Sequence, residues 1–310
     1  MALLSKLRNI VLLCSIIAVV SGGKLFASGL QEDSSRVNKK RLHWVIGTEA
    51  TLFAGSMFGL YHLWYSDYPQ SGFHFINDNS EWQYMDKVGH AVSSYYVGKI
   101  GYESLRWSGV DKKTSAIYGG SLGFVHLLTV EILDGFSAEW GASAGDLLFN
   151  TMGSAAFVGQ QLLWDEQRMV FKFSFHQSPY AKYNPDLMGK NYIQNMLKDY
   201  NGQTYWLSGN IRSFTGKNSQ FPAWLNVAFG YGAGGMTSAS ENIDEYNGGP
   251  APYFERYKQY YLSLDIDLTR IKTNSDILKI IFEALGFIKI PFPALEYNTK
   301  NELKFHWLYF

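Results

Sequence analysis

The sequence lacks cysteine almost completely and carries little charge. Cys14 is the only cysteine among the 310 residues, and it lies close to the N-terminus. The rest of the chain therefore has neither disulfides nor thiolate metal ligands. Charged residues make up 17% of the chain, against about 25% in soluble domains, and aromatic residues reach 16%. A wide apolar surface must therefore be buried somewhere.

An excess of positive charge is also missing. Lys plus Arg and Asp plus Glu each number 27, so no overall positive field attracts nucleic acid by counterion release. The sequence contains no HExxH, GxSxG, Walker or GxGxxG pattern either. We therefore expect no nucleic-acid partner, and we predict no cofactor apart from the divalent metal considered below.

The N-terminus has the layout of a secretory signal peptide. Basic Lys6 and Arg8 precede an apolar run at 10–20, and small residues follow it. Such a segment directs export, so we expect a signal peptide at 1–27. The polar stretch that follows has no periodicity, and it predicts a flexible leader at 28–42.

Cys14 raises the question of a lipid anchor. A lipoprotein signal needs a small residue just before its cysteine, but Leu13 occupies that position and apolar residues follow Cys14. This argues against lipidation. An exported chain that is rich in aromatics and lacks disulfides is typical of the periplasm or outer membrane of a Gram-negative bacterium.

Two halves of the chain have different apolar periods, which predicts an α+β fold. At 43–165 the period is helical, in four apolar segments that begin near His43, Trp82, Thr114 and Ser143. Helices of about 20 residues are about 30 Å long, which is also the thickness of a bilayer core. We expect an apolar four-helix bundle with at least one face against lipid or against the second half.

The β-rich region at 166–310 alternates with a period of two. In RMVFKFSFH and QYYLSLDIDLTRI, apolar and polar residues alternate as in strands with one buried face. Three further segments and a weaker one, GFIKIPFP, complete an antiparallel sheet of five or six strands. The terminal Phe310 is typical of outer-membrane barrels, but six strands are fewer than the about eight that a barrel needs. A half-open sheet packed on the helices is favoured over a barrel-like structure.

Three of the expected helices carry polar residues at helical spacing. Asp86 and His90 are four residues apart, as are Asp146 and Asn150, and Glu131 precedes Asp134 by three. Each pair therefore shares one helix face. The candidate site residues are thus His90, Asp86, Glu131, Asp134, Asp146 and Asn150.

The chemistry of these residues leaves two interpretations open. If the stripes meet, Asp86, His90, Glu131 and Asp146 have the ligand types of a divalent metal site. A carboxylate could instead orient His90 as a general base. The alternative is structural, because charges inside a helical bundle pair with each other to avoid the cost of unpaired burial. From the residues alone, the structural interpretation is favoured.

Two blocks carry a resemblance to a known family. EWQYMDKVGHAVSSYY and EILDGFSAEWGASAGDLLFNTMGS resemble the YfiM-like family of predicted periplasmic lipoproteins, a domain of unknown function, over about 73–161. Later blocks such as FPAWLNVAFGYGAGGM resemble the longer envelope members found in Bacteroidetes. This resemblance implies an envelope location and no established reaction.

The helical half is also similar, more distantly, to VanZ-like membrane proteins. Their motifs pair an Asp-Lys-x-x-His helix with a later acidic residue and an Asp-x-x-x-Asn-x-x-Gly helix. An arginine that usually precedes the last aspartate is missing from AEWGAS, so either Glu139 or Trp140 replaces it or its role is absent from this chain. The matching residues are Asp86, Lys87, His90, Glu131, Asp146, Asn150 and Gly153.

These observations predict an uncharacterised cell-envelope protein, associated with the outer membrane or its periplasmic face, in a structural or interaction role. One alternative is an envelope enzyme that acts on a lipid or glycan, with His90 as general base. A binding module for an amphipathic ligand is another, because aromatic residues are so abundant. We lean against an enzyme.

Overall fold

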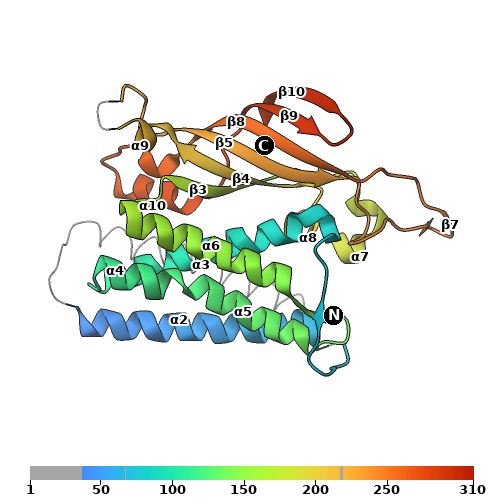
Figure 1. The fold of residues 1–310 in the computed structure, drawn as a ribbon, viewed down its shortest axis with the longest axis horizontal. Coiled ribbons are helices and arrows are strands. Elements are labelled where there is room, and N and C mark those ends of the chain that lie inside the picture. The colour runs from blue at the N-terminus through green and yellow to red at the C-terminus, as the bar shows by residue number, and fades with distance from the viewer. Residues whose placement is uncertain (1–36, 67, 217–218) are drawn as a thin grey trace. The chain divides into compact units, whose positions relative to one another are not determined.

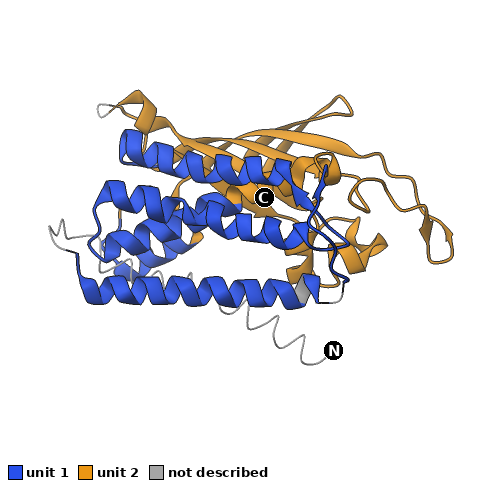
Figure 2. Ribbon diagram, turned by 60° about the horizontal axis from the view of Figure 1, so that its bottom comes forward, with its two compact units in different colours: residues 1–77, 93–167, 273–284 blue, residues 78–92, 168–272, 285–310 orange. Residues whose placement is uncertain are grey.

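The computed structural model describes residues 37–66, 68–216 and 219–310, so the expected signal peptide lies outside the described residues. The chain divides into two compact units, shown in blue and orange in Figure 2. We call them the helical unit and the sheet unit. The helical unit comprises Met1–Asn77, Ser93–Gln167 and Thr273–Ala284, and the sheet unit comprises Asp78–Val92, Arg168–Lys272 and Leu285–Phe310.

All four expected apolar segments are helical, and the second belongs to the helical unit from Ser93 onward. The first helix begins at Lys39 rather than near His43, because Asn38 caps it by accepting a hydrogen bond from the backbone amide of Arg41. The third segment is divided into three helical pieces. The elements are α2 (Lys39–Leu60), the π-helical η1 (Tyr61–Tyr65), α3 (Met85–Trp107) from Ser93 onward, α4 (Lys112–Thr114), the π-helical η3 (Ser115–Gly119), α5 (Leu122–Gly135), α6 (Ala144–Trp164) and most of α10 (Asp276–Leu285). The short strands β1 (Phe75–Ile76) and β2 (Ala142–Ser143) pair in parallel.

Glycine allows α3 and the third segment to pack backbone against backbone. A Cβ at Gly123 would lie 1.8 Å from the carbonyl oxygen of Ser94, and one at Gly98 would lie 2.4 Å from that of Gly120. No side chain fits at either distance. These glycines therefore permit the close approach of the two segments.

Glu49 is the only acidic residue of α2, and burial raises its pKa to about 7. Between pH 4.5 and 7 the folded state therefore binds more protons than the unfolded state, so the free energy of unfolding falls as pH rises through this window. We expect Glu49→Gln to remove part of this fall, as measured by urea unfolding at pH 5 and pH 8. Equal decreases in the free energy of unfolding between pH 5 and pH 8 in wild type and variant would contradict the assignment. The pKa of Glu103 is also raised to about 7, so part of the decrease should remain in the variant.

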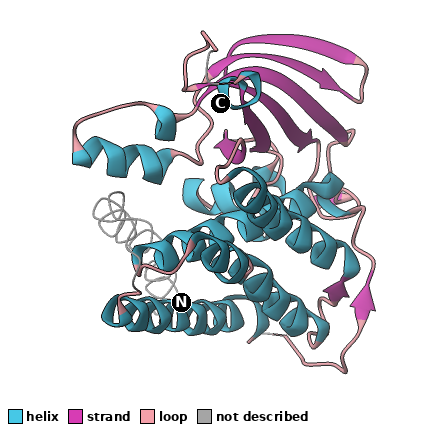
Figure 3. Ribbon diagram, turned by 60° about the vertical axis from the view of Figure 1, so that its left-hand side comes forward, coloured by secondary structure: helices cyan, strands magenta, loops and turns pink. Residues whose placement is uncertain are grey.

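The sheet unit is built on six antiparallel strands in the order β10-β9-β8-β5-β4-β3. Figure 3 shows them as one curved layer. Among the described strands the sheet is open, so no closed barrel forms. The strands are β3 (Met169–Phe175), β4 (Gln203–Asn210), β5 (Leu225–Gly234), β8 (Tyr257–Ile266), β9 (Phe292–Asn298) and β10 (Glu302–Tyr309). The weak strand expected in GFIKIPFP begins only at Phe292, while Lys289 donates its amide proton to the carbonyl of Phe173 beside it.

Short elements complete the sheet unit. The two-stranded ribbon of β6 (Glu245–Tyr246) and β7 (Gly249–Pro250) follows β5. The helix α8 (Tyr192–Lys198) also belongs to this unit. The remaining helical turns are η2 (Glu81–Tyr84), η4 (Ala181–Tyr183), α7 (Pro185–Met188), α9 (Ile211–Thr215) and η5 (Leu268–Arg270).

The buried face of the sheet is the one that carries the charged residues of the central strands. In β8, Ser263 and Asp265 are buried, whereas Leu262 and Leu264 are 44% and 40% exposed. In β3, Lys172 is completely buried. Alternation identifies the two faces of a strand, but it does not say which one turns inward.

Two lysines and one aspartate occupy this interior together. The side chains of Lys172, Asp265 and Lys289 are 0% exposed, with Nζ of Lys172 at 2.8 Å and Nζ of Lys289 at 3.8 Å from the carboxylate. Lys172 also donates to the carbonyl of Ile266, and Ser208 donates to Asp265. Burial lowers the pKa of Lys289 to about 8, against the opposing attraction of Asp265.

Candidate functional site

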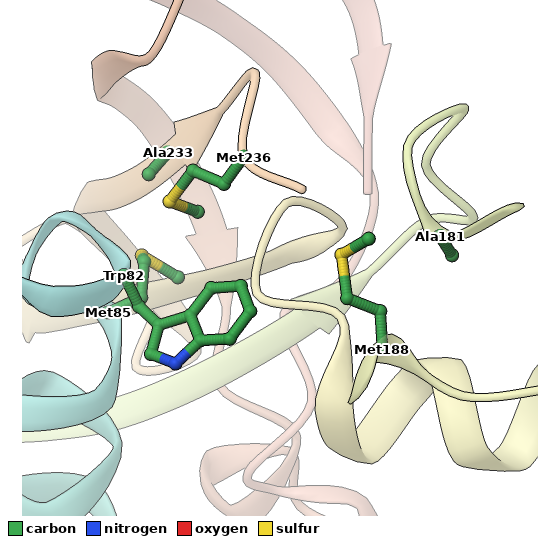
Figure 4. Close-up of a cluster of buried hydrophobic side chains, with 6 residues drawn as sticks. All are labelled: Trp82, Met85, Ala181, Met188, Ala233 and Met236. Carbon is green, nitrogen blue, oxygen red and sulfur yellow. The ribbon is translucent and has the colours of Figure 1, made fainter. Parts of the chain in front are cut away.

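An irregular turn fixes the start of α3. In the turn Glu81–Tyr84, residues Trp82, Gln83 and Tyr84 have φ of 49°, 53° and 68°. These left-handed conformations are costly for residues that carry a Cβ. The hydroxyl of Tyr231 donates to the carbonyl of Gln83 and holds the turn in place. Figure 4 shows the apolar cluster at this turn, which comprises Trp82, Met85, Ala181, Met188, Ala233 and Met236.

Asp86 is bound by a tyrosine that is distant in sequence. Tyr200 donates from its hydroxyl to Oδ1 of Asp86 over 2.6 Å. Nε2 of His90 lies 3.9 Å from Oδ2, which is too long for a hydrogen bond. The buried Lys87 places its Nζ 2.7 Å from Asp78 and 3.5 Å from Asp86. The Asp-Lys-His stripe is thus one charged network around the first turn of α3.

Gly89 brings the same helix close to the sheet within this unit. A Cβ there would lie 2.9 Å from the hydroxyl oxygen of Tyr205. Burial and the negative charge of Asp86 raise the pKa of Tyr205, so its hydroxyl stays protonated at neutral pH. It donates to the side chain of Gln203. The hydroxyl is therefore a hydrogen-bond donor rather than a base.

In the helical unit, Glu131 and Asp146 meet at the start of α6. Oε2 of Glu131 accepts from the backbone amide of Ser143, and Oγ of Ser143 accepts from the backbone amide of Asp146. Ser143 is thus the residue that caps α6, and Asp146 lies in the first turn, where the helix dipole favours negative charge. All three side chains are buried.

Asn150 lies one turn further along α6 and contacts α3 through its backbone. Ser94 donates from Oγ to the carbonyl of Asn150 over 2.7 Å, and its Oγ is 2.8 Å from that of Ser154. Ser154 also accepts from the amide of Phe124. These bonds connect three helices through small polar groups, and each of the three residues is buried.

Asp134 is separate from this cluster. Its Oδ1 accepts from the hydroxyl of Tyr65 over 2.5 Å. Burial, together with the nearby charge of Asp134, raises the pKa of Tyr65, so the tyrosine stays a donor. Asp134 therefore binds the segment after α2 to the end of α5.

The six predicted residues are divided between the units. Asp86 and His90 belong to the sheet unit, and the four residues of α5 and α6 belong to the helical unit. Within the helical unit, Glu131 and Asp146 both lie at Ser143. The convergence of all three stripes, and with it a shared metal site or a general base at His90, stays a prediction.

Several residues of these networks were not predicted. Tyr200 and Ser94 supply hydroxyls to Asp86 and to the carbonyl of Asn150. Lone hydroxyl residues carry no periodic signal, so the sequence did not single them out. Ser143 offered a signal, since a serine three residues before an acidic residue is typical of a helix cap.

Comparison with known families matches the stretch that holds the six predicted residues. Residues 71–161 match the family described as predicted periplasmic lipoprotein (DUF2279). The sequence-based resemblance to predicted periplasmic lipoproteins is confirmed for this stretch, and the match supports an exported protein. The narrower resemblances to YfiM-like and VanZ-like proteins stay predictions. No curated protein and no solved structure matches the chain.

One described helical stretch, Lys112–Gly135, is long and apolar enough to cross a membrane by length and composition. Over an 18-residue segment of this stretch the mean hydropathy is 1.5, and 28% of that segment is buried.

Proposed function

We propose that this chain is an envelope protein that associates with the outer membrane and acts structurally or in envelope interactions. The observation that carries the proposal is the apolar surface of the helical unit. Trp44 and Phe58 on α2 are 73% and 59% exposed, and Leu163 on α6 is 77% exposed. Several large apolar side chains exposed on one unit are typical of a surface that contacts a membrane or a partner.

The hydrogen bonds of the polar networks favour the structural role over the enzymatic one. Asp86 is bound by Tyr200, Lys87 by Asp78, and Glu131 by the amide of Ser143. Lys87 and Glu131 are buried, so loss of either partner would leave a buried charge without compensation. In this proposal α2, α3, α5 and α6 form the bundle that the sequence predicts, and the networks fix its ends. An enzyme that acts on an envelope lipid or glycan through His90 is the alternative.

Vesicle flotation tests the proposal. We expect the full chain to float with vesicles of phosphatidylethanolamine and phosphatidylglycerol. The double variant Trp44→Glu, Phe58→Glu should float several-fold less, because each charge must leave water to enter the bilayer. The control Thr48→Glu adds one carboxylate at an exposed polar position of α2 and removes no apolar side chain, so it should float better than the double variant. A wild-type chain that stays with the soluble fraction would contradict membrane association.

A further inference from the structure

Outward-facing apolar residues form a continuous row across all six strands of the sheet. The strand register places each one directly opposite the next, with no charged residue among them. At the middle of the row, Phe229 is 62% exposed, and Phe305 at its end is 52% exposed. The row consists of Phe171, Leu207, Phe229, Leu262, Leu295 and Phe305.

A second row runs beside the first and is dominated by tyrosine. Its members on β8 and β9, Tyr260 and Tyr297, are 45% and 47% exposed. Near the other side of the sheet, the residues Trp82–Met85 partly cover Tyr205 and Tyr231. The row consists of Phe173, Tyr205, Tyr231, Tyr260, Tyr297 and Leu303.

Polarity changes in order along the outward face. Two residues beyond the tyrosine row, Lys258 pairs with Ala233, and Lys300 lies in the adjoining turn. At the opposite end, Trp307 is 82% exposed and Trp224 is 38% exposed. An apolar band with aromatic residues at both borders and cations beyond one border has the same order of polarity as a lipid monolayer.

The inner face of the sheet has a different character. Lys172 and Asp265 form a completely buried ion pair there, and Trp206 and Tyr261 also pack in the interior. Charged groups thus lie inside while the outward band is apolar, which is the pattern of a surface that lipid solvates.

We propose that the outward face of the sheet, from β5 to β10, contacts phospholipid acyl chains. In this arrangement the tyrosine row lies at the headgroup level, and Lys258 and Lys300 lie at the phosphates. From Tyr260 to Ile266 the strand rises about 20 Å, which exceeds one leaflet of a bilayer core about 30 Å thick. The proposal rests on the membrane association proposed above and adds a second, separate lipid contact.

Site-specific quenching tests this contact. Cysteine is introduced into the full chain at Phe229→Cys, Leu262→Cys or Leu295→Cys and labelled with bimane. The labelled chain is bound to vesicles of phosphatidylethanolamine and phosphatidylglycerol whose acyl chains are brominated. We expect several-fold stronger quenching than for the matched control Asp186→Cys, since Asp186 is an exposed polar residue of the same unit. Unchanged urea unfolding verifies that each variant is folded.

Each other outcome has a definite meaning. If the chain floats with vesicles but these three probes are quenched by aqueous iodide and not by brominated lipid, the sheet contact is wrong and membrane association stands. Disulfide crosslinking of Leu262→Cys between two chains, with no lipid quenching, would show that a second copy covers the face, and would also overturn the proposal. A chain that does not float refutes the association itself.

Discussion

Replacing Asp265 by alanine is expected to lower the free energy of unfolding by about 3–5 kcal/mol. The substitution leaves the ammonium groups of Lys172 and Lys289 buried at 0% exposure without their shared carboxylate. It also removes the acceptor of the Ser208 hydroxyl. Urea unfolding measures the loss. A change below about 1 kcal/mol would contradict the burial of these charges.

Two control variants make this prediction specific. Asp186→Ala removes a carboxylate that is 82% exposed in a surface ion pair, so its cost should be small beside that of Asp265→Ala. The triple variant Lys172→Met, Asp265→Leu, Lys289→Met removes all three charges together. It should recover most of the stability, because an apolar replacement has no charge to desolvate.

Gly123→Ala is expected to destabilise the helical unit by about 3 kcal/mol or more. The added Cβ would lie 1.8 Å from the carbonyl oxygen of Ser94, which is backbone and cannot rotate away. The helices would have to separate, and the hydrogen bond from Ser94 to Asn150 would be lost with them. Thermal unfolding followed by circular dichroism measures the effect.

Gly159 supplies the matched control. It also lies inside a long helix, α6, but a Cβ there would meet nothing within 4 Å. Gly159→Ala should therefore leave stability unchanged or raise it by about 0.5–1 kcal/mol, because alanine favours the helix. Equal effects at both glycines would contradict the close approach of α3 and α5.

The sequence predicts the elements of this fold better than their burial. Apolar spacing located the starts of α3 and α6 within three residues, and alternation located β3 and β8. Alternation does not decide which face of a strand turns inward. In this sheet Asp265 is buried while Leu264 is exposed.

The candidate site was predictable to the extent that it is local. Asp86 with His90 and Asp146 with Asn150 follow from helical spacing alone. Their partners do not, because Tyr200 is 114 residues from Asp86 and Ser94 is 56 residues from Asn150. Contacts over such separations depend on tertiary packing, which periodicity does not report.

Membrane association is the central claim, and fractionation of a Gram-negative cell that produces the full chain tests it most directly. We expect the mature protein in the outer-membrane fraction of a density gradient, and we expect it to stay there after extraction with sodium carbonate. That result is expected because exposed apolar side chains such as Trp44 and Phe229 would attach the protein to the membrane. Carbonate disrupts attachment through charge pairs but not through apolar contacts. Recovery of the protein in the soluble periplasmic fraction would contradict the account.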